Sequence, residues 1–126
     1  MLRTFLLLAC AVLPTAAHAQ QQECAALFTG GQPPALLSPK LAQRTTPLCN
    51  DAFAVLASGI TRGPLWAAEH PTSDSLAGAR ATPRQGQFHP VDRLPVDDQA
   101  LLQDYSRSGY DRGHMVPSGD MPDAQA

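Results

Sequence analysis

Proline and glycine interrupt this chain so often that no long regular element fits between them. The 126 residues contain 12 prolines and 9 glycines. Because proline removes a backbone donor and glycine favours turns, the pattern predicts short helices and strands joined by many loops. The length allows one domain at most. A hydrophobic share of 44% supplies enough apolar material for a core, so a wholly disordered chain is not expected.

The N-terminus has the organisation of a targeting segment. Arg3 is followed by an apolar stretch over residues 4–13 and by the small residues of Ala17-His18-Ala19. A positive start, a short apolar run and an A-x-A site make up a secretory signal, so residues 1–19 are predicted to be removed. The run is too short to span a bilayer. An alternative is a lipoprotein signal that is acylated at Cys10.

This interpretation predicts an exported protein, periplasmic or secreted, with no membrane attachment after the signal is removed. Cys24 and Cys49 are then the remaining cysteines. An even pair in an oxidising compartment predicts a Cys24–Cys49 disulfide. The alternative is that the two cysteines are free or paired elsewhere.

Hydrophobic patterning divides the rest of the chain into an arm and a domain. Residues 20–47 are polar and proline-containing, and they are predicted to form an extended arm before a domain over residues 48–126. Residues 53–57 are apolar on both faces, as in a buried strand. Residues 65–70 follow after a glycine- and proline-containing loop and predict a second strand, so the two are expected to form a hairpin.

The second half of the domain is expected to be irregular. Residues 71–84 are rich in serine, threonine, glycine and proline and are predicted to be loop. A short helix is predicted from Asp97 or Asp98 to Tyr105, with Gly109 ending it in the left-handed conformation.

The overall charge favours no particular partner. The formal net charge is −2, whereas a nucleic-acid-binding domain often carries a basic surplus. This counts against tight binding through charge alone, but a hydrolytic enzyme needs only a local positive site.

Arg112 and His114 stand two residues apart, so they project to the same side of an extended segment. Histidine can accept a proton near neutral pH, and the arginine fork matches phosphate oxygens. Both side chains could therefore serve one phosphate, with Gly113 allowing close approach. The alternative is a surface pair in which Asp111 is a salt-bridge partner for Arg112.

The remaining candidates are expected to have structural roles. His70 and His89 are predicted to be structural or exposed, and Trp66 is predicted to lie in the core rather than to stack on nucleic-acid bases.

Residues 108–121, SGYDRGHMVPSGDM, resemble the signature of the DNA/RNA non-specific endonucleases, a family that includes secreted bacterial nucleases and mitochondrial endonuclease G. Residues 49–55 and 62–70 are similar to the family's early hairpin. The resemblance covers roughly residues 48–123. It implies an α+β chain with the ββα-metal fold and hydrolysis of DNA and RNA without sequence specificity.

The resemblance also implies roles for individual residues. His114 takes the place of the general base, and Arg112 that of the arginine that contacts the phosphate. Arg84 is the nearest match to a second, upstream arginine that binds substrate. The metal is expected to be magnesium, held by an asparagine in a later segment resembling Ser-Asn-x-x-Pro-Gln. The only asparagine here is Asn50, before the signature.

The metal-binding asparagine is therefore expected to lie beyond Ala126. The chain is interpreted as the N-terminal part of such a nuclease, truncated before the metal-binding helix and inactive alone. One alternative is a non-catalytic exported module that binds nucleic acid or a partner. Another is a small structural domain whose Asp111–His114 run is a turn. A homodimer is left open.

Overall fold

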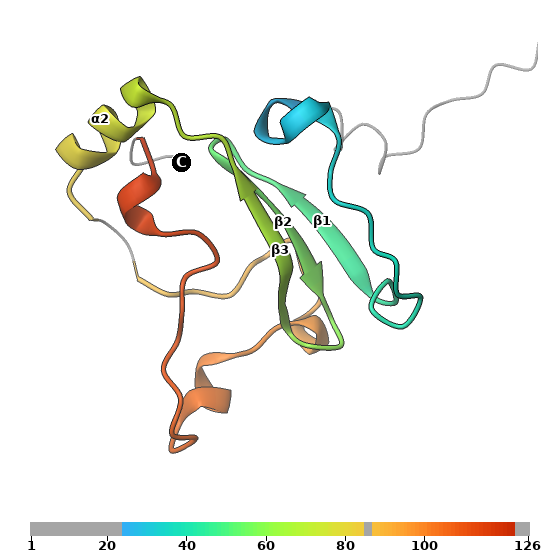
Figure 1. Ribbon diagram of the computed structural model, residues 1–126. Coiled ribbons are helices and arrows are strands. Elements are labelled where there is room, and N and C mark those ends of the chain that lie inside the picture. The colour runs from blue at the N-terminus through green and yellow to red at the C-terminus, as the bar shows by residue number, and fades with distance from the viewer. Residues whose placement is uncertain (1–23, 85–86, 123–126) are drawn as a thin grey trace, which may run out of the picture.

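The computed structural model describes residues 24–84 and 87–122, and the predicted signal with Cys10 lies outside them. A three-stranded antiparallel sheet is accompanied by one α-helix and several short 3₁₀ turns, as Figure 1 shows. The predicted α+β class is therefore confirmed. Among the described residues, no helix has the length and apolar character needed to cross a membrane.

The sheet has the strand order β1-β2-β3, with bounds Thr45–Cys49, Phe53–Ser58 and Gly63–Glu69. Strands β2 and β3 form the predicted hairpin, in which Val55 pairs with Ala67. Strand β1 was not predicted, because Pro47 interrupts its pattern. It is an edge strand, where a proline is tolerated because one side of the backbone has no neighbour to bond.

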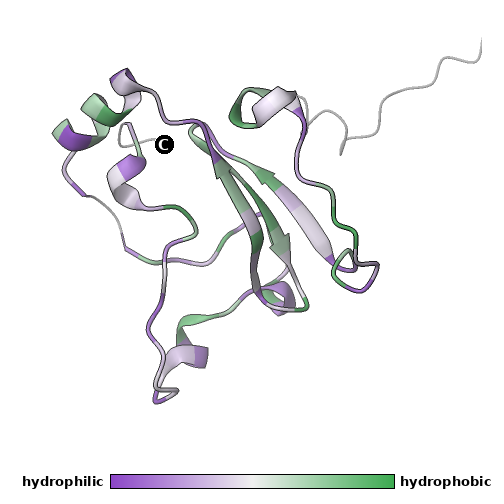
Figure 2. Cartoon of the chain, viewed as in Figure 1, coloured by the Kyte–Doolittle hydropathy of each residue, from purple (hydrophilic) through white to green (hydrophobic). Residues whose placement is uncertain are grey.

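The core lies against β1 and β2. Leu48, Val55, Ala57 and Leu94 are buried together, and Phe53 and Val91 pack around them. Figure 2 shows hydrophobic colouring along β2 and β3 and hydrophilic colouring in many of the connections. Because Leu94 belongs to this cluster, the core fixes the long segment after Phe88 against the sheet.

A disulfide attaches the start of the described chain to the sheet. Cys24 and Cys49 are bonded, with 5.8 Å between their Cα atoms, as predicted. Between them lie 3₁₀ turns at Ala25–Leu27 and Thr29–Gly31 and an irregular stretch that leads to β1. The bond therefore fixes this stretch at both ends.

Helix α2 occupies Ser73–Ala81, so the prediction of loop over residues 71–84 is wrong. Its N-terminus carries a reciprocal cap. The Ser75 amide donates to the Thr72 hydroxyl at 3.1 Å, and the Thr72 amide donates to the Ser75 hydroxyl at 2.8 Å. These bonds satisfy donors that the first helical turn would otherwise leave free.

The other end of α2 packs on the C-terminal described segment. A Cβ added at Gly78 would lie 2.9 Å from the Pro122 carbonyl oxygen, so only glycine allows this approach. The Thr82 hydroxyl donates to the Gly78 carbonyl and to the Pro122 carbonyl, at 3.0 and 3.2 Å. Helix α2 thereby holds the segment that follows the signature.

The prediction of a helix from Asp97 or Asp98 to Tyr105 is also wrong. Two separate 3₁₀ turns stand there instead, Val96–Asp98 and Leu102–Tyr105. Between them the buried Gln99 side chain accepts from the Val91 amide at 2.7 Å and donates to the Leu94 carbonyl at 2.8 Å. These bonds brace the preceding loop, so the side chain of Gln99 organises this region rather than a continuous helix.

Candidate active site

The predicted signature residues lie on an irregular segment that belongs to no helix or sheet. Gly109, at φ 81°, takes the left-handed conformation predicted for it and redirects the chain into this segment. The Ser108 hydroxyl stabilises the turn by donating to the Tyr105 carbonyl at 3.0 Å and accepting from the Tyr110 amide at 3.1 Å. The following side chains, Arg112 and His114, are exposed.

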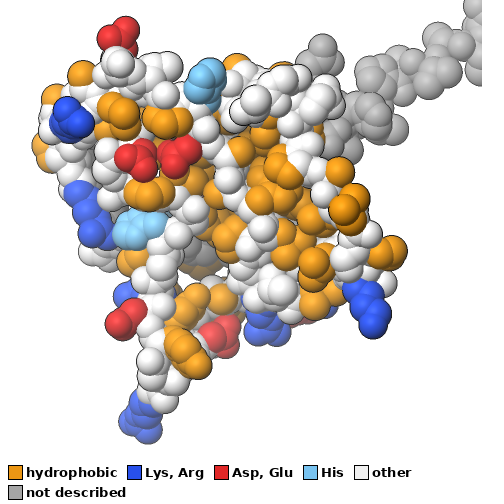
Figure 3. Space-filling model, viewed as in Figure 1, with side chains coloured by type: hydrophobic (Ala, Val, Ile, Leu, Met, Phe, Trp, Pro, Cys, Tyr) orange, Lys and Arg blue, Asp and Glu red, His pale blue; other side chains and the backbone are white. Residues whose placement is uncertain are grey.

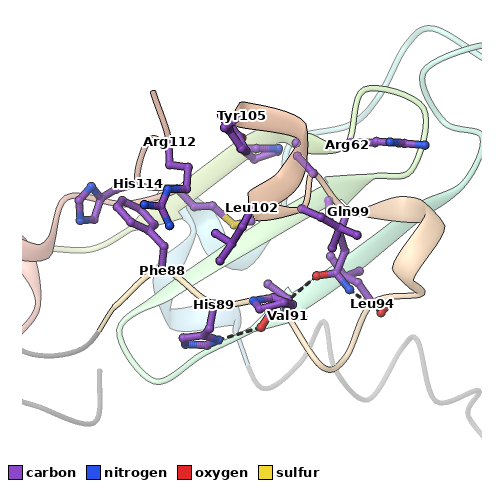
Figure 4. A pocket seen from close by; sticks show the side chains of 18 of the residues that line it. Arg62, Phe88, His89, Val91, Leu94, Gln99, Leu102, Tyr105, Arg112 and His114 are labelled. Carbon is purple, nitrogen blue, oxygen red and sulfur yellow. Dashed lines mark hydrogen bonds between the residues drawn. The ribbon is translucent and has the colours of Figure 1, made fainter. Parts of the chain in front are cut away.

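Phe88 is the residue around which the site assembles. The guanidinium carbon of Arg112 lies 5.0 Å from the centre of its ring. The His114 ring meets the same ring with 5.0 Å between centroids and an interplanar angle of 60°. Figure 4 shows Arg112 and His114 beside Phe88. A partly buried aromatic ring thus holds both predicted side chains in place.

Arg84 joins the same group from the segment after α2. One of its terminal nitrogens, Nη2, lies 3.2 Å from Nε2 of His114. The structure therefore brings the three sequence-predicted site residues, Arg84, Arg112 and His114, into one group. Arg84 is exposed, so solvent and ligands can reach the contact.

Two of these residues, Arg112 and His114, line a cavity of about 490 Å³, and Arg84 reaches it through its contact with His114. Arg112, His114 and Phe88 line one end of it in Figure 4. Arg62, Gln99 and Leu94 line the other. Figure 3 shows Lys and Arg side chains mainly at the edges of the face in view, with apolar side chains between them. The cavity itself combines Arg62 and Arg112 with apolar lining residues, although the whole chain has a negative net charge.

Phe88 and Arg62 are the site residues that the sequence did not single out for a role. Phe88 stands well before the signature, and no local spacing connects it to Arg112. Arg62 lies in the turn before β3, where its φ of 54° is left-handed. Only the packing of the segment after Phe88 against the sheet brings both residues to one cavity.

The other sequence candidates contact backbone or core groups instead, although His89 also lines the cavity. Nδ1 of His70 lies 3.0 Å from the Ala26 carbonyl, and Nδ1 of His89 lies 2.7 Å from the Pro90 carbonyl. Both side chains are exposed, in line with their predicted structural or exposed status. The Trp66 ring is partly buried and meets Phe28 edge-on at 5.6 Å, so it packs inside the protein.

The alternative pairing of Arg112 with Asp111 is not observed. The ion pairs between described residues are Arg44–Asp98 and Arg62–Asp104. Arg112 has no carboxylate partner in the part of the chain that the structure describes, so its charge is available to an anion.

The residues that the structure describes do not form a cluster of metal ligands. They contain no group of three histidine, cysteine or acidic side chains that could hold one. The side-chain oxygen of Asn50 accepts a hydrogen bond from Arg93, and Asn50 does not line the cavity. Glu69 and Asp120 do interact, and burial followed by the charge of Asp120 raises the pKa of Glu69. Two carboxylates do not make an all-protein cation site, and neither residue lines the cavity.

Three proteins illustrate what the chain is similar to. Nuclease 1, mitochondrial, of Schizosaccharomyces pombe is 47% identical over 60 residues, 48% of this chain and 19% of the relative. The mitochondrial nuclease of Saccharomyces cerevisiae is 42% identical over 60 residues, 48% of this chain and 18% of the relative. Nuclease C1 of Cunninghamella echinulata is 43% identical over 56 residues, 44% of this chain and 22% of the relative. The match thus spans about a fifth of each relative, and no solved structure matches the chain significantly.

These relatives correct the predicted location. The two yeast proteins are named as mitochondrial, which contradicts the prediction of an exported, periplasmic or secreted protein. The physical reason is that secretory and mitochondrial targeting segments share several features. Positions 1–22 have one basic residue, an apolar run and no acidic residue, and these features do not distinguish the two kinds.

A family model supplies the wider assignment. It describes the DNA/RNA non-specific endonucleases and matches residues 33–126, about three quarters of the chain. The match includes Arg84, Phe88, Arg112 and His114, which the structure brings together. The chain belongs to the DNA/RNA non-specific endonuclease family.

Proposed function

We propose that this chain carries the phosphate-binding and proton-accepting part of a metal-dependent nuclease that hydrolyses DNA and RNA without sequence specificity. In this proposal His114 is the general base, and Arg112 and Arg84 contact the phosphate. The grouping of these three side chains, with Arg112 and His114 against Phe88 and Arg84 against His114, is the observation that supports it most. The relatives' printed names support the nuclease class.

The proposed chemistry follows from what phosphodiester hydrolysis requires. Water attacks phosphorus while its proton passes to the imidazole of His114, and the bond from phosphorus to the sugar oxygen breaks. Arginine donors stabilise the negative charge on the phosphate oxygens. Arg112 is suited to this role because its guanidinium lies over the Phe88 ring and has no carboxylate partner among the described residues.

The finer fold and the metal belong to the same proposal. Strands β2 and β3 and the signature segment would form part of a ββα-metal fold. When bound, magnesium would stabilise the departing oxygen. The family resemblance assigns it an asparagine in a segment like Ser-Asn-x-x-Pro-Gln, whereas the described residues do not provide a ligand set. We therefore expect residues 24–122 alone to bind phosphodiesters without cleaving them.

A chimera tests the nuclease assignment. Residues 33–126 of this chain would replace the matching segment of the S. pombe Nuclease 1, which supplies the remainder of a family protein. We expect magnesium-dependent plasmid cleavage by the chimera and only background cleavage by residues 24–122. A chimera with native-like circular dichroism and no cleavage, beside an active host, would contradict the proposal.

A non-catalytic binding module is the second candidate, because the described residues bring together anion-binding groups without a metal-ligand set. It predicts that a folded chimera binds oligonucleotides but does not cleave them. The same assay therefore separates the two functions.

A further inference from the structure

The contact between Arg84 and His114 fixes where the proton of a neutral His114 ring must be. A guanidinium has only donors and stays charged at all accessible pH values. At 3.2 Å from Nη2 of Arg84, Nε2 of His114 must therefore be the acceptor. A neutral imidazole carries one N–H, so that proton lies on Nδ1. The tautomer follows from the identity of the partner.

In this arrangement neither nitrogen of the neutral His114 ring offers a free lone pair. Nδ1 already carries a proton, and the lone pair of Nε2 is engaged by Arg84. A doubly protonated imidazolium would present N–H to N–H at this contact, so its formation requires Arg84 to leave. The Nε2 lone pair becomes more available when Arg84 finds a better acceptor.

A phosphate is such an acceptor, and the site can deliver one. Arg112 holds its charge over Phe88, close to the His114 ring. Both Arg84 and His114 are exposed, so their contact is weak, because solvent screens exposed polar pairs. Hydrogen bonds from arginine to a phosphate are charge-assisted and frequently bidentate, hence stronger than a bond to a neutral ring nitrogen.

We propose that Arg84 is a positioning residue that caps Nε2 of His114 in the free protein and transfers to the phosphate when substrate binds. The transfer increases the share of His114 rings whose Nε2 is free to accept a proton when an anion is present. The inference rests on the proposed function for its purpose, but the contact and the tautomer can be measured without cleavage.

Nitrogen-15 NMR of the histidine rings in the full chain tests this proposal, at a pH at which the imidazole is neutral. We expect the His114 signals to show an Nε2 that carries no proton and accepts a hydrogen bond, and an Nδ1 that carries the proton. Arg84→Ala should move the ratio of the two tautomers toward protonated Nε2 by roughly two- to fivefold, the size expected for an exposed pair. Arg84→Lys, which keeps a donor, should restore part of the original ratio. Arg80→Ala removes an exposed arginine in the last turn of α2 and should leave the spectrum unchanged.

Dimethyl phosphate, a phosphodiester without a base, supplies the second arm. Compared with chloride at equal ionic strength, it should move the His114 signals of the unaltered chain toward those of Arg84→Ala, and it should have little effect on that variant. The proposal is overturned if Arg84→Ala leaves the tautomer ratio unchanged, or if dimethyl phosphate shifts the variant as much as the unaltered chain.

If the tautomer responds as expected but the chimera cleaves nothing, the proposed function fails and the cap remains. If the chimera cleaves through His114 but the tautomer ignores Arg84, only the cap fails.

Discussion

At the scale of single residues, Phe88 connects parts of the site that are distant in sequence. Arg112 and His114 could be found from the sequence, since residues two apart in an extended segment share a side. Phe88 could not, because its ring has no reactive group and its contacts depend on tertiary packing. Arg84 was proposed from the family resemblance alone. Its contact with Nε2 of His114 is a geometric fact that no spacing predicts.

Glu69 gives a prediction on pH. Burial, and then the charge of Asp120, raises the pKa of its carboxyl above the ordinary 4.5. A group whose pKa is higher in the folded state stabilises the fold below its unfolded pKa, and this contribution is lost as the pH rises through the folded pKa. Glu69→Gln should therefore raise the free energy of unfolding at neutral pH and change it little below pH 4.5. Urea unfolding at both pH values measures this. Asp51→Asn, at an exposed carboxylate, is the control, and a loss of stability in Glu69→Gln at neutral pH would contradict the account.

At the scale of elements, the hairpin was predictable and α2 was not. Strands β2 and β3 carry runs of apolar residues separated by a turn, which is a local signal. Helix α2 contains Gly78 and two serines, which have low helix propensity. The helix is stabilised by the reciprocal cap at Thr72 and Ser75 and by the packing of Gly78 against Pro122. The packing against Pro122 depends on a segment far away in the sequence, so local patterns do not predict it.

Removal of the cap tests this explanation of α2. Thr72→Ala deletes the hydroxyl that accepts from the Ser75 amide, so the free energy of unfolding should fall by about 0.5–2 kcal/mol. Thr72→Ser keeps the acceptor and should retain most of the stability. Urea unfolding followed by circular dichroism compares the two variants. Equal midpoints for Thr72→Ala and the unaltered chain would show that the cap does not stabilise the helix.

At the scale of the whole molecule, the disulfide joins the first described residue to the sheet. Cys24 and Cys49 are 25 residues apart, and a cross-link over such a loop restricts the unfolded chain by roughly 3–4 kcal/mol in the chain-entropy model. The double variant Cys24→Ser, Cys49→Ser should lose stability on that scale in urea unfolding. The free energy should also fall when the unaltered chain is reduced, while the reductant should not affect the double variant. Equal stability of the reduced and oxidised chains would contradict this role.

The family and the α+β class followed from ordered sequence segments, while the location did not. Several motifs in the right order constrain a fold because each must occupy a defined place in it. A targeting segment is defined only by charge and apolarity, and these properties led to the wrong compartment.

The role of His114 is the central claim, and turnover by the chimera tests it most directly. His114→Ala removes the proton acceptor but leaves Arg112 over Phe88, so kcat should fall by about 10²–10⁴-fold while KM changes little. Arg112→Ala should raise KM as well, because its phosphate contact also acts in the ground state. His89→Ala alters an exposed histidine of the same cavity and should leave kcat near the unaltered value. The account is contradicted if His114→Ala keeps full turnover while His89→Ala abolishes it.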